Sequence, residues 1–359
     1  MNRKNVTERK KIMKKYLAIL LALVMTFTLC ACGAQKEDTP PAEDTSDEAT
    51  SETTETGWVP EKNISVIVPY GAGDGIDILT RTLVDHLDVP VNVVVENISG
   101  GGGSIGAEDA FNRAADGYTV LCLANSPAIS QTILNDTITY NTTDWTPVAE
   151  MSARCGIAMC SQPSLGLEDS AALKEFLESG ETFTFGVPQM SGGVYVAAAS
   201  TFKEMGIIDN CTFVSYDGIP ALYQAYLAGE VDFAAFDDNL ALGYAKDNPD
   251  VVVNVILGAA KSVFFPDLDC IADWGYEGLD GNVIVKYLAV RSDTPAEIID
   301  YLSEKFNDAM LTDSYQQWVV DNDFGDYPVP FTAEETAETV SQIKDLYYVV
   351  FEEAGLISK

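Results

Sequence analysis

The chain has 359 residues, enough for two domains of ordinary size, and 47% of them are hydrophobic, so a large core can form. It carries 55 acidic residues against 21 basic ones, a formal net charge of −34. That balance excludes nucleic-acid binding and adsorption of the folded body to an anionic membrane, because no surplus of lysine or arginine is present to meet phosphates.

The first residues predict an export signal that ends at a lipid-attachment site. Residues 1–15 hold seven basic residues and one acid, and an apolar run from Tyr16 to Leu29 follows. A basic segment before a short apolar segment is typical of a secretory signal, and the run is too short for a comfortable transmembrane helix. Residues 29–33 (LCACG) resemble a bacterial lipobox. We therefore predict a signal peptide at 1–31 and lipidation of Cys32; a plain signal peptide is the alternative.

Residues 32–57 predict a disordered acidic linker. They are rich in Ser, Thr, Pro, Glu and Asp and show no apolar periodicity. Such a segment cannot bury enough apolar surface to offset the entropy cost of ordering, and its like charges repel each other. We expect it to hold a folded body away from the membrane.

From residue 63 onward, short apolar strands alternate with helical patterns. We predict strands at 64–68, 91–96, 118–123, 183–185, 212–214, 231–236, 251–257 and 286–290, and helices at 77–86, 104–113, 167–179, 194–205, 219–228, 295–311 and 333–354. This alternation indicates parallel sheets with right-handed crossovers, and the number of strands indicates two α/β lobes. Ligands of such folds bind at loops that run from strands into helix N-termini, where the glycine-rich segments of this chain lie.

Three residues are assigned to helix ends. Thr294 and Thr332 are the expected N-caps of the last two helices. His86, the single histidine, lies near the end of the helix at 77–86. We predict a C-terminal helical residue there rather than a catalytic one, and one histidine cannot build a multi-histidine metal site.

Residues 101–106 (GGGSIG) match the G-x-G-x-x-G pattern after a strand and before a helix. A dinucleotide site would place an acidic residue after the next strand, but residues 124–126 are Ala-Asn-Ser. We therefore predict a tight strand-to-helix turn with close backbone approach, and no cofactor.

Five cysteines lie in the body: Cys122, Cys155, Cys160, Cys211 and Cys270. Cys122 falls inside an apolar strand and is expected to be buried. No CxxC pair meets another, so no zinc site is predicted, and a Cys155–Cys160 disulfide stays open as an alternative.

Five segments in order resemble the solute receptors of tripartite tricarboxylate transporters, the Bug-type extracytoplasmic binding proteins. Residues 67–77 (IVPYGAGDGID) are similar to the family's V-P-F/Y-x-A-G-G-x-x-D, and residues 95–107 to its V-E-N-x-x-G-A-G-G-x-x-G-A. Residues 115–121 resemble x-D-G-Y-T-L-L, residues 214–221 resemble V-P-Y-K-G-x-x-P-A, and residues 228–237 resemble G-G-x-V-D…F-D. The resemblance covers nearly all of the body, from about Trp58 to the C-terminus.

The resemblance implies an α/β, two-lobed type II periplasmic-binding-protein fold, in which each lobe is a mostly parallel sheet flanked by helices. Lobe 1 would hold residues 58–155 and 285–359, and lobe 2 residues 156–284. The implied function is an extracytoplasmic receptor, not an enzyme, which binds a small carboxylate or amino acid and delivers it to transporter membrane subunits. We expect a monomer attached to the membrane through its lipid only.

Family members hold ligands with backbone N–H groups of two facing loops and with bridging waters. The resemblance therefore implies a site made by Tyr70, Ala72, Gly73, Asp74, Gly75, Asp77, Ser126, Gln189, Ser191, Gly192 and Asp237. The family often has a small or polar residue where Asp74 stands, and often a His where Tyr195 or Val196 stands. Asp74 would repel a dianion, so we expect a ligand less anionic than citrate, such as an amino acid or aromatic monoacid.

Two other function classes stay open. An exported α/β hydrolytic enzyme is one, but neighbouring acids such as Asp237 and Asp238 point apart in a strand and make no acid/base couple. A receptor that signals to a sensor instead of a permease is the other, because the sequence does not reveal the docking surface.

Overall fold

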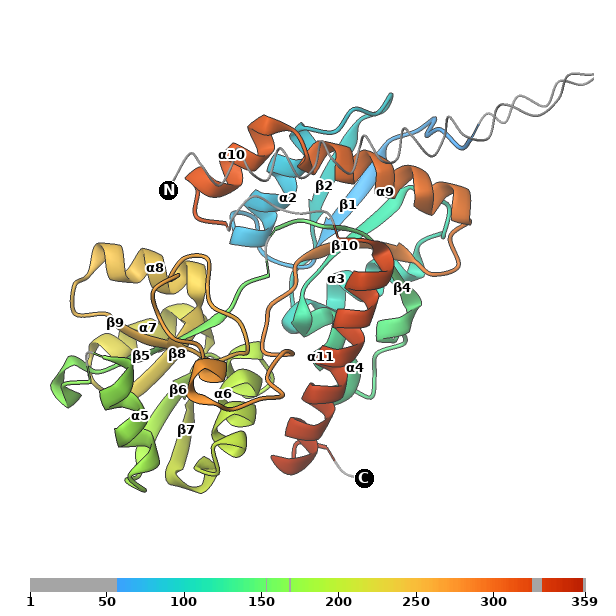
Figure 1. Ribbon diagram of the computed structural model, residues 1–359. Coiled ribbons are helices and arrows are strands. Elements are labelled where there is room, and N and C mark those ends of the chain that lie inside the picture. Colours follow the sequence, from blue (N-terminus) through green and yellow to red (C-terminus); the bar gives the residue numbers. More distant parts are fainter. Residues whose placement is uncertain (1–56, 153, 168, 325–330, 358–359) are drawn as a thin grey trace, which may run out of the picture. The chain divides into compact units, whose positions relative to one another are not determined.

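The computed structural model describes residues 57–152, 154–167, 169–324 and 331–357 (Figure 1). The predicted signal peptide, Cys32 and residues 32–56 of the predicted linker lie outside the described residues. No helix within those described ranges is long and apolar enough to cross a membrane.

The described chain contains two five-stranded sheets. The first has the order β2-β1-β3-β10-β4, from strands β2 (Val93–Asn97), β1 (Ile64–Val68), β3 (Thr119–Leu123), β10 (Tyr287–Arg291) and β4 (Trp145–Glu150). The second has the order β7-β6-β8-β5-β9, from β7 (Cys211–Ser215), β6 (Phe183–Val187), β8 (Phe233–Asp237), β5 (Ile157–Ser161) and β9 (Val252–Ile256).

Both sheets are mixed rather than mostly parallel. In the first, β1 pairs in parallel with β2 and β3, whereas β10 runs antiparallel to β3 and β4. In the second, β6 pairs in parallel with β7 and β8, whereas β5 runs antiparallel to β8 and β9. Each antiparallel strand enters its sheet directly from the other one instead of after a crossover helix, so no crossover dictates its direction.

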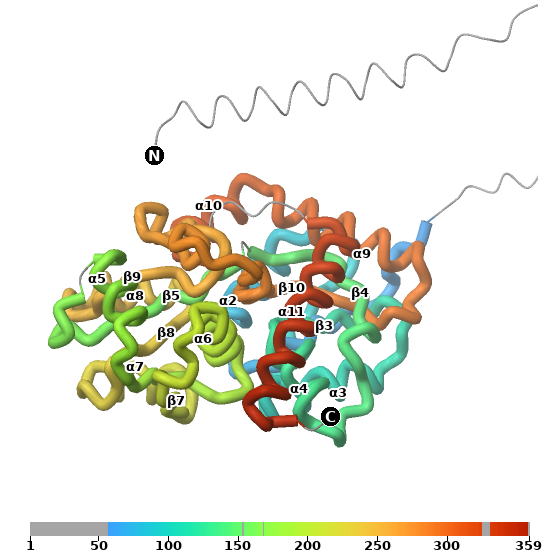
Figure 2. Tube along the Cα trace, turned by 60° about the horizontal axis from the view of Figure 1, so that its bottom comes forward, coloured from blue at the N-terminus to red at the C-terminus, as the bar shows by residue number. Residues whose placement is uncertain are grey.

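Helices cover both sheets (Figure 1). The helices after the strands of the first sheet are α2 (Gly75–Asp85), α3 (Ser104–Asn112), α4 (Gln131–Leu134), α9 (Ala296–Met310) and α10 (Asp313–Asp321). Those after the strands of the second are α5 (Ser170–Glu178), α6 (Gly193–Glu204), α7 (Gly218–Leu227) and α8 (Asp238–Asp247). The last helix, α11 (Ala333–Glu353), packs on both β4 and α6, and Figure 2 shows it running between them.

Helix ends follow the predicted caps in two of three cases. Thr332 caps α11, and its side chain and that of Glu335 form a reciprocal capping box, as predicted. His86 is the C-cap of α2, also as predicted. The prediction for Thr294 was wrong: Pro295 is the N-cap of α9, with ψ at 139°, so the helix begins one residue later than Thr294 requires.

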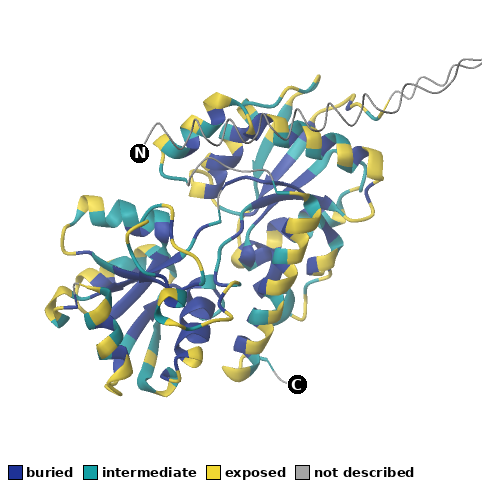
Figure 3. Cartoon of the chain, viewed as in Figure 1, coloured by how far each residue is buried: buried dark blue, intermediate teal, exposed yellow. Residues whose placement is uncertain are grey.

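The strands of both sheets are largely buried (Figure 3), and alternate residues of a strand face opposite sides of the sheet. In β1, Ile67 belongs to one buried cluster, while Val66 and Val68 belong to another on the opposite face. The cluster that contains Ile67 also contains residues of β6, α6 and α11, including Tyr347. Both faces of the first sheet are therefore buried, and Cys122 in β3 is fully buried, as predicted.

Two connections join the sheets and lie side by side. The N–H of Cys155 donates to the carbonyl of Ile284 at 3.1 Å, and the N–H of Ile284 donates back at 2.9 Å. Asn125 holds the second connection: its Nδ2 donates to the carbonyl of Val283 at 2.8 Å, and its Oδ1 accepts from the N–H of Val285 at 3.0 Å. We propose that the lobe boundaries lie within these connections, at 155/156 and 284/285.

Candidate functional site

The first predicted loop runs from the end of β1 into α2, and its acidic residues fix its shape. Asp74 is the N-cap of α2: its Oδ1 accepts from the N–H of Ile76 at 3.1 Å, and the residue is exposed. Gly73 has a φ of +84°, which favours glycine, and its N–H donates to Oδ2 of Asp77 at 2.8 Å. That amide is therefore already bonded within the loop.

Asp77 is buried beneath this loop, with 2% of its surface exposed. Its carboxylate also accepts from Nε of Arg81 at 3.1 Å and from Nδ2 of Asn97 at 2.8 Å. Burial alone would raise the pKa of Asp77, but the hydrogen bonds from Arg81, Gly73 and Asn97 outweigh it, and the pKa lies below its ordinary value. Asp77 is thus a charged anchor of the loop; its contact with a ligand stays a prediction.

Tyr70, Asp74 and Asp237 influence one another electrostatically although they follow strands of different sheets. Tyr70 follows β1 and is half-buried, and Asp237 ends β8. Burial raises the pKa of the Tyr70 hydroxyl, and its neighbours Asp74 and Asp237 are among the groups that raise it further. Burial also raises the pKa of Asp237, with Asp74 adding to the shift and Lys286 opposing it. Three of the predicted site residues therefore share one electrostatic environment.

The second predicted loop runs from β6 into α6. Gln189 is exposed, and its carbonyl accepts from the N–H of Gly192 at 3.3 Å in a turn. Gly192 is the N-cap of α6 and has no side chain to cap the first turn. Ser191 is half-buried between them.

Gly193, the first residue of α6, ties this loop to the rest of the site. A Cβ added there would lie 2.5 Å from Cδ1 of Ile284 and 2.9 Å from the hydroxyl of Tyr347. The Tyr347 hydroxyl contacts Nδ2 of Asn125 at 3.1 Å. Burial raises the pKa of Tyr347, and Asp237 contributes to the same shift. The N-terminus of α6 therefore lies against the second connection and against Tyr347, on which Asp237 acts electrostatically.

Ser126 follows Asn125 and lies against the glycine-rich segment after β2. Its Oγ donates to the carbonyl of Gly102 at 3.0 Å. Gly102 and Gly103 have φ values of +64° and +95°, and a Cβ at Gly106 would lie 2.5 Å from the carbonyl oxygen of Ile98. This is the tight turn with close backbone approach that the sequence predicts.

Sequence reasoning missed Lys286 and Cys155, which face each other across the two connections. Nζ of Lys286 lies 2.9 Å from Sγ of Cys155. Burial lowers the pKa of Lys286, but Cys155, Asp237 and Asp238 raise it more, so the pKa lies above its ordinary value. Burial raises the pKa of Cys155 to about 11, so at neutral pH a thiol faces an ammonium. The one available signal was a lysine at the start of an apolar strand.

Sequence reasoning also missed that Asp238 holds neighbouring segments in place through hydrogen bonds. It is buried and begins α8. The prediction that Asp237 and Asp238 lie in one strand was therefore wrong. Its Oδ2 accepts from the N–H of Gly156 at 3.0 Å and from Oγ of Ser262 at 2.7 Å. Burial raises the pKa of Asp238 to about 6 against the effect of these hydrogen bonds.

The other cysteines of the described body carry no crosslink. Cys122, Cys160, Cys211 and Cys270 are free thiols, so the alternative of a Cys155–Cys160 disulfide is not formed. Within the described ranges, no group of three His, Cys, Asp or Glu side chains is arranged to hold a metal ion.

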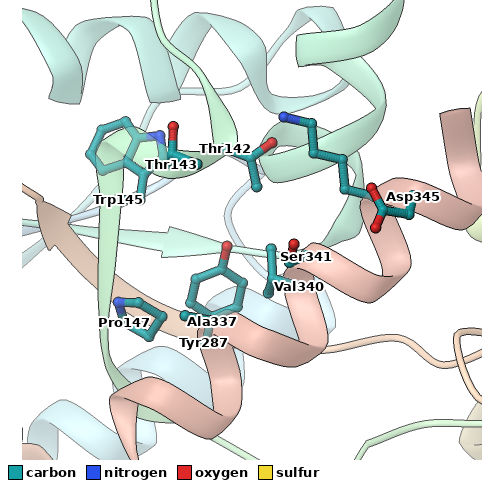
Figure 4. A pocket seen from close by; sticks show the side chains of 10 residues that line it. Thr142, Thr143, Trp145, Pro147, Tyr287, Ala337, Val340, Ser341 and Asp345 are labelled. Carbon is teal, nitrogen blue, oxygen red and sulfur yellow. The ribbon is translucent and has the colours of Figure 1, made fainter.

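A cavity of about 350 Å³ lies between α11 and strands β4 and β10 (Figure 4). Figure 4 shows Trp145, Pro147 and Tyr287 of the strands facing Val340 and Ser341 of the helix. Its lining shares no residue with the predicted site. We therefore do not assign the ligand to it.

Residues 79–345 match the family model described as the tripartite tricarboxylate transporter family receptor. Protein BugT of Bordetella pertussis is 27% identical over 259 residues, which cover 70% of this chain and 77% of BugT.

Solved structures resemble this chain over most of its length. A TctC solute-binding protein from Polaromonas has a TM-score of 0.69 at 20% identity, covering 82% of this chain and 99% of its own. MatC from Rhodopseudomonas palustris, solved with malate, has a TM-score of 0.65 at 18% identity, covering 81% and 99%. An R. palustris protein solved with adipate has a TM-score of 0.67 at 21% identity, covering 82% and 98%. These likenesses confirm the two-lobed periplasmic-binding-protein fold.

Proposed function

Since the chain belongs to the tripartite tricarboxylate transporter receptor family, we propose that it captures a small carboxylate-bearing molecule and delivers it to the membrane subunits of such a transporter. The family and the structural neighbours are solute-binding proteins, so the chain is an extracytoplasmic receptor and not an enzyme.

The observation that carries the proposal is the electrostatic influence that Tyr70 and Asp74, after β1, share with Asp237, at the end of β8 in the other sheet. Three helices, α2, α6 and α8, begin beside these residues or beside the second connection. Helix N-termini present N–H groups and positive dipole ends, which favour a carboxylate. A ligand held there would touch groups from both sheets.

We assign the remaining contacts to backbone and small polar groups. Ala72, Gly75 and Gly192 offer main-chain atoms at the two loops, and Gln189 and Ser191 offer side chains. The N–H of Gly73 is occupied by Asp77, so that amide acts by shaping the loop. Ser126, which bonds to Gly102, would need to turn to reach a ligand in this region.

The charges favour a ligand less anionic than citrate. Proteins of similar structure were solved with malate and adipate. Here Asp74 and Asp237 place two carboxylates near the proposed site, which would repel a di- or tricarboxylate and attract an ammonium or hydroxyl group. An amino acid or an aromatic monoacid carries a single carboxylate and so avoids this repulsion.

The mature receptor would be a monomer held at the membrane by a lipid on Cys32. Its acidic linker at 32–57 would separate the body from the bilayer. This arrangement rests on the sequence of the N-terminal segment, outside the described residues.

A thermal-shift screen tests the function. The mature chain would be heated with amino acids, benzoate, malate, adipate, citrate and neutral sugars. A ligand at 100 times its Kd stabilises the folded state by about 2.7 kcal/mol, which raises Tm by several degrees. We expect a shift with an amino acid or a monoacid. Shifts for sugars alone would overturn the carboxylate proposal, and tight citrate binding would overturn the proposed ligand class.

A further inference from the structure

We propose that Lys286 is the residue that binds the ligand's carboxylate in this chain, exchanging the Cys155 thiol for a ligand oxygen. The inference rests on the proposed function and specifies its site further. Its basis is the position of Lys286 on a connection between the two sheets and the weak hydrogen-bond acceptor, the Cys155 thiol, that its ammonium contacts.

The position of Lys286 suits a ligand contact. It is half-buried on the second connection, one residue before β10. Asp237 and Asp238 from the second sheet act on its ammonium. Cys122, on the neighbouring strand β3, is influenced by both Lys286 and Asp74. The ammonium, in contact with Cys155, therefore acts on groups that Asp74 and Asp237 also influence.

The present contact of Lys286 leaves its ammonium poorly satisfied. An ammonium has three N–H donors, whereas a thiol is a weak acceptor. Among the described residues, Lys286 forms no ion pair with a carboxylate. Asp238 already accepts from Gly156 and Ser262, and the side chain of Asp237 does not cap α8. Asp237 and Asp238 favour the charged form of Lys286 without bonding to it, so a carboxylate oxygen would give its N–H groups a stronger acceptor than the thiol.

The same arrangement explains how a site with two acids could bind an acid. Lys286 would bind the ligand's carboxylate, while Asp74 and Asp237 would face an ammonium or hydroxyl group at the other end of the ligand. One cation between two acids accepts one carboxylate, and a second carboxylate on the ligand would face repulsion. The predicted class is therefore a zwitterionic or hydroxylated monocarboxylic acid.

Calorimetric titration of the mature chain tests this role. The probes are the best-binding carboxylate of the screen and its neutral primary amide, measured on wild type, Lys286→Gln and Lys286→Arg. Lys246→Gln is the matched control, because Lys246 is exposed and pairs with Asp323 at 2.8 Å on the surface. We expect Lys286→Gln to weaken acid binding by about tenfold or more and to change amide binding little. Lys286→Arg should retain much of the affinity, and Lys246→Gln all of it.

The other possible outcomes test the role of Lys286 separately from the proposed function. Unchanged acid binding by Lys286→Gln, or equal losses for acid and amide, would overturn the inference and leave the proposed function intact. Failure of wild type to bind any carboxylate would overturn both. If Lys286→Gln does not fold, reductive methylation of wild type decides: the ligand should protect Lys286 but not Lys246, and equal labelling with and without ligand would overturn the inference.

Discussion

Two acidic residues three positions apart have different roles in the first loop. Asp77 is buried and accepts hydrogen bonds from Gly73, Arg81 and Asn97, so it fixes the loop. Asp74 is exposed and caps α2 through a single bond to Ile76. The free side of the Asp74 carboxylate is therefore the part of this loop that can discriminate between ligands by charge.

Replacing Asp74 by Asn tests that discrimination. Asn caps a helix as well as Asp does, so α2 should keep its stability while the loop loses one charge. We expect Asp74→Asn to weaken binding of an amino acid several-fold and to improve binding of malate, as measured by calorimetric titration. Asp74→Ala is the control for the cap and should cost about 1 kcal/mol of unfolding free energy. An unchanged order of affinities would contradict the role of the charge.

Asp238 makes stability depend on pH in a predictable direction. Its folded pKa of about 6 lies above the ordinary value, so the folded state holds a proton that the unfolded state releases. Stability should therefore fall as pH rises from about 4 to about 6 and then level off. The difference is about 2–3 kcal/mol, at 1.36 kcal/mol for each unit of pKa shift. Urea unfolding of wild type and Asp238→Asn between pH 4 and 8 measures it; parallel curves would contradict the assignment.

At the scale of elements, regular periodicity made most helices and strands predictable, and its absence explains the omissions. Strand β4 carries Pro147 in its interior, which argues against a strand in sequence reasoning. Helix α8 begins at Asp238, inside an acidic pair, and contains Gly243. Packing decided both: β4 is covered by α9 and α11, and α8 packs on β5, β8 and β9.

Two glycine-to-alanine changes should have opposite effects. A Cβ at Gly193 would approach the Tyr347 hydroxyl, which is buried and bonded to Asn125. Gly193→Ala should therefore cost about 1–3 kcal/mol of unfolding free energy and weaken ligand binding. Gly243 lies inside α8 with no atom near its added Cβ, so Gly243→Ala should stabilise by about 0.5–1 kcal/mol. Denaturant unfolding measures both; equal effects would contradict the packing of α6 against Tyr347.

At the scale of the whole molecule, a folded receptor body follows an N-terminal segment whose sequence predicts an export signal and a lipid-attachment site. The chain is strongly acidic, so any attachment to an anionic membrane would depend on the proposed lipid and not on the folded surface.

Cys32→Ala should release the protein from the membrane fraction. Without the acceptor thiol no lipid can be attached, and the acidic chain has little affinity for anionic lipids. Fractionation of cells that express wild type, Cys32→Ala and Cys30→Ala measures the effect. Cys30→Ala is the matched control and should stay in the membrane fraction. Release of Cys30→Ala instead of Cys32→Ala would show that the lipid is attached to the other cysteine.

The sequence by itself determined the alternation of strands and helices, the loops after β1 and β6, and the family. These depend on neighbours along the chain: apolar periodicity, glycines where φ is positive, and caps such as Thr332. Only the tertiary structure decided that Asp237 acts electrostatically on Tyr70 and that Lys286 faces Cys155. It also decided that the Asp77 carboxylate accepts a hydrogen bond from Gly73 of the same loop. Lys286 and Cys155 are separated by 131 residues, and they meet because two connections pair between the sheets. Pairing of this kind depends on how the sheets pack, which no local pattern encodes.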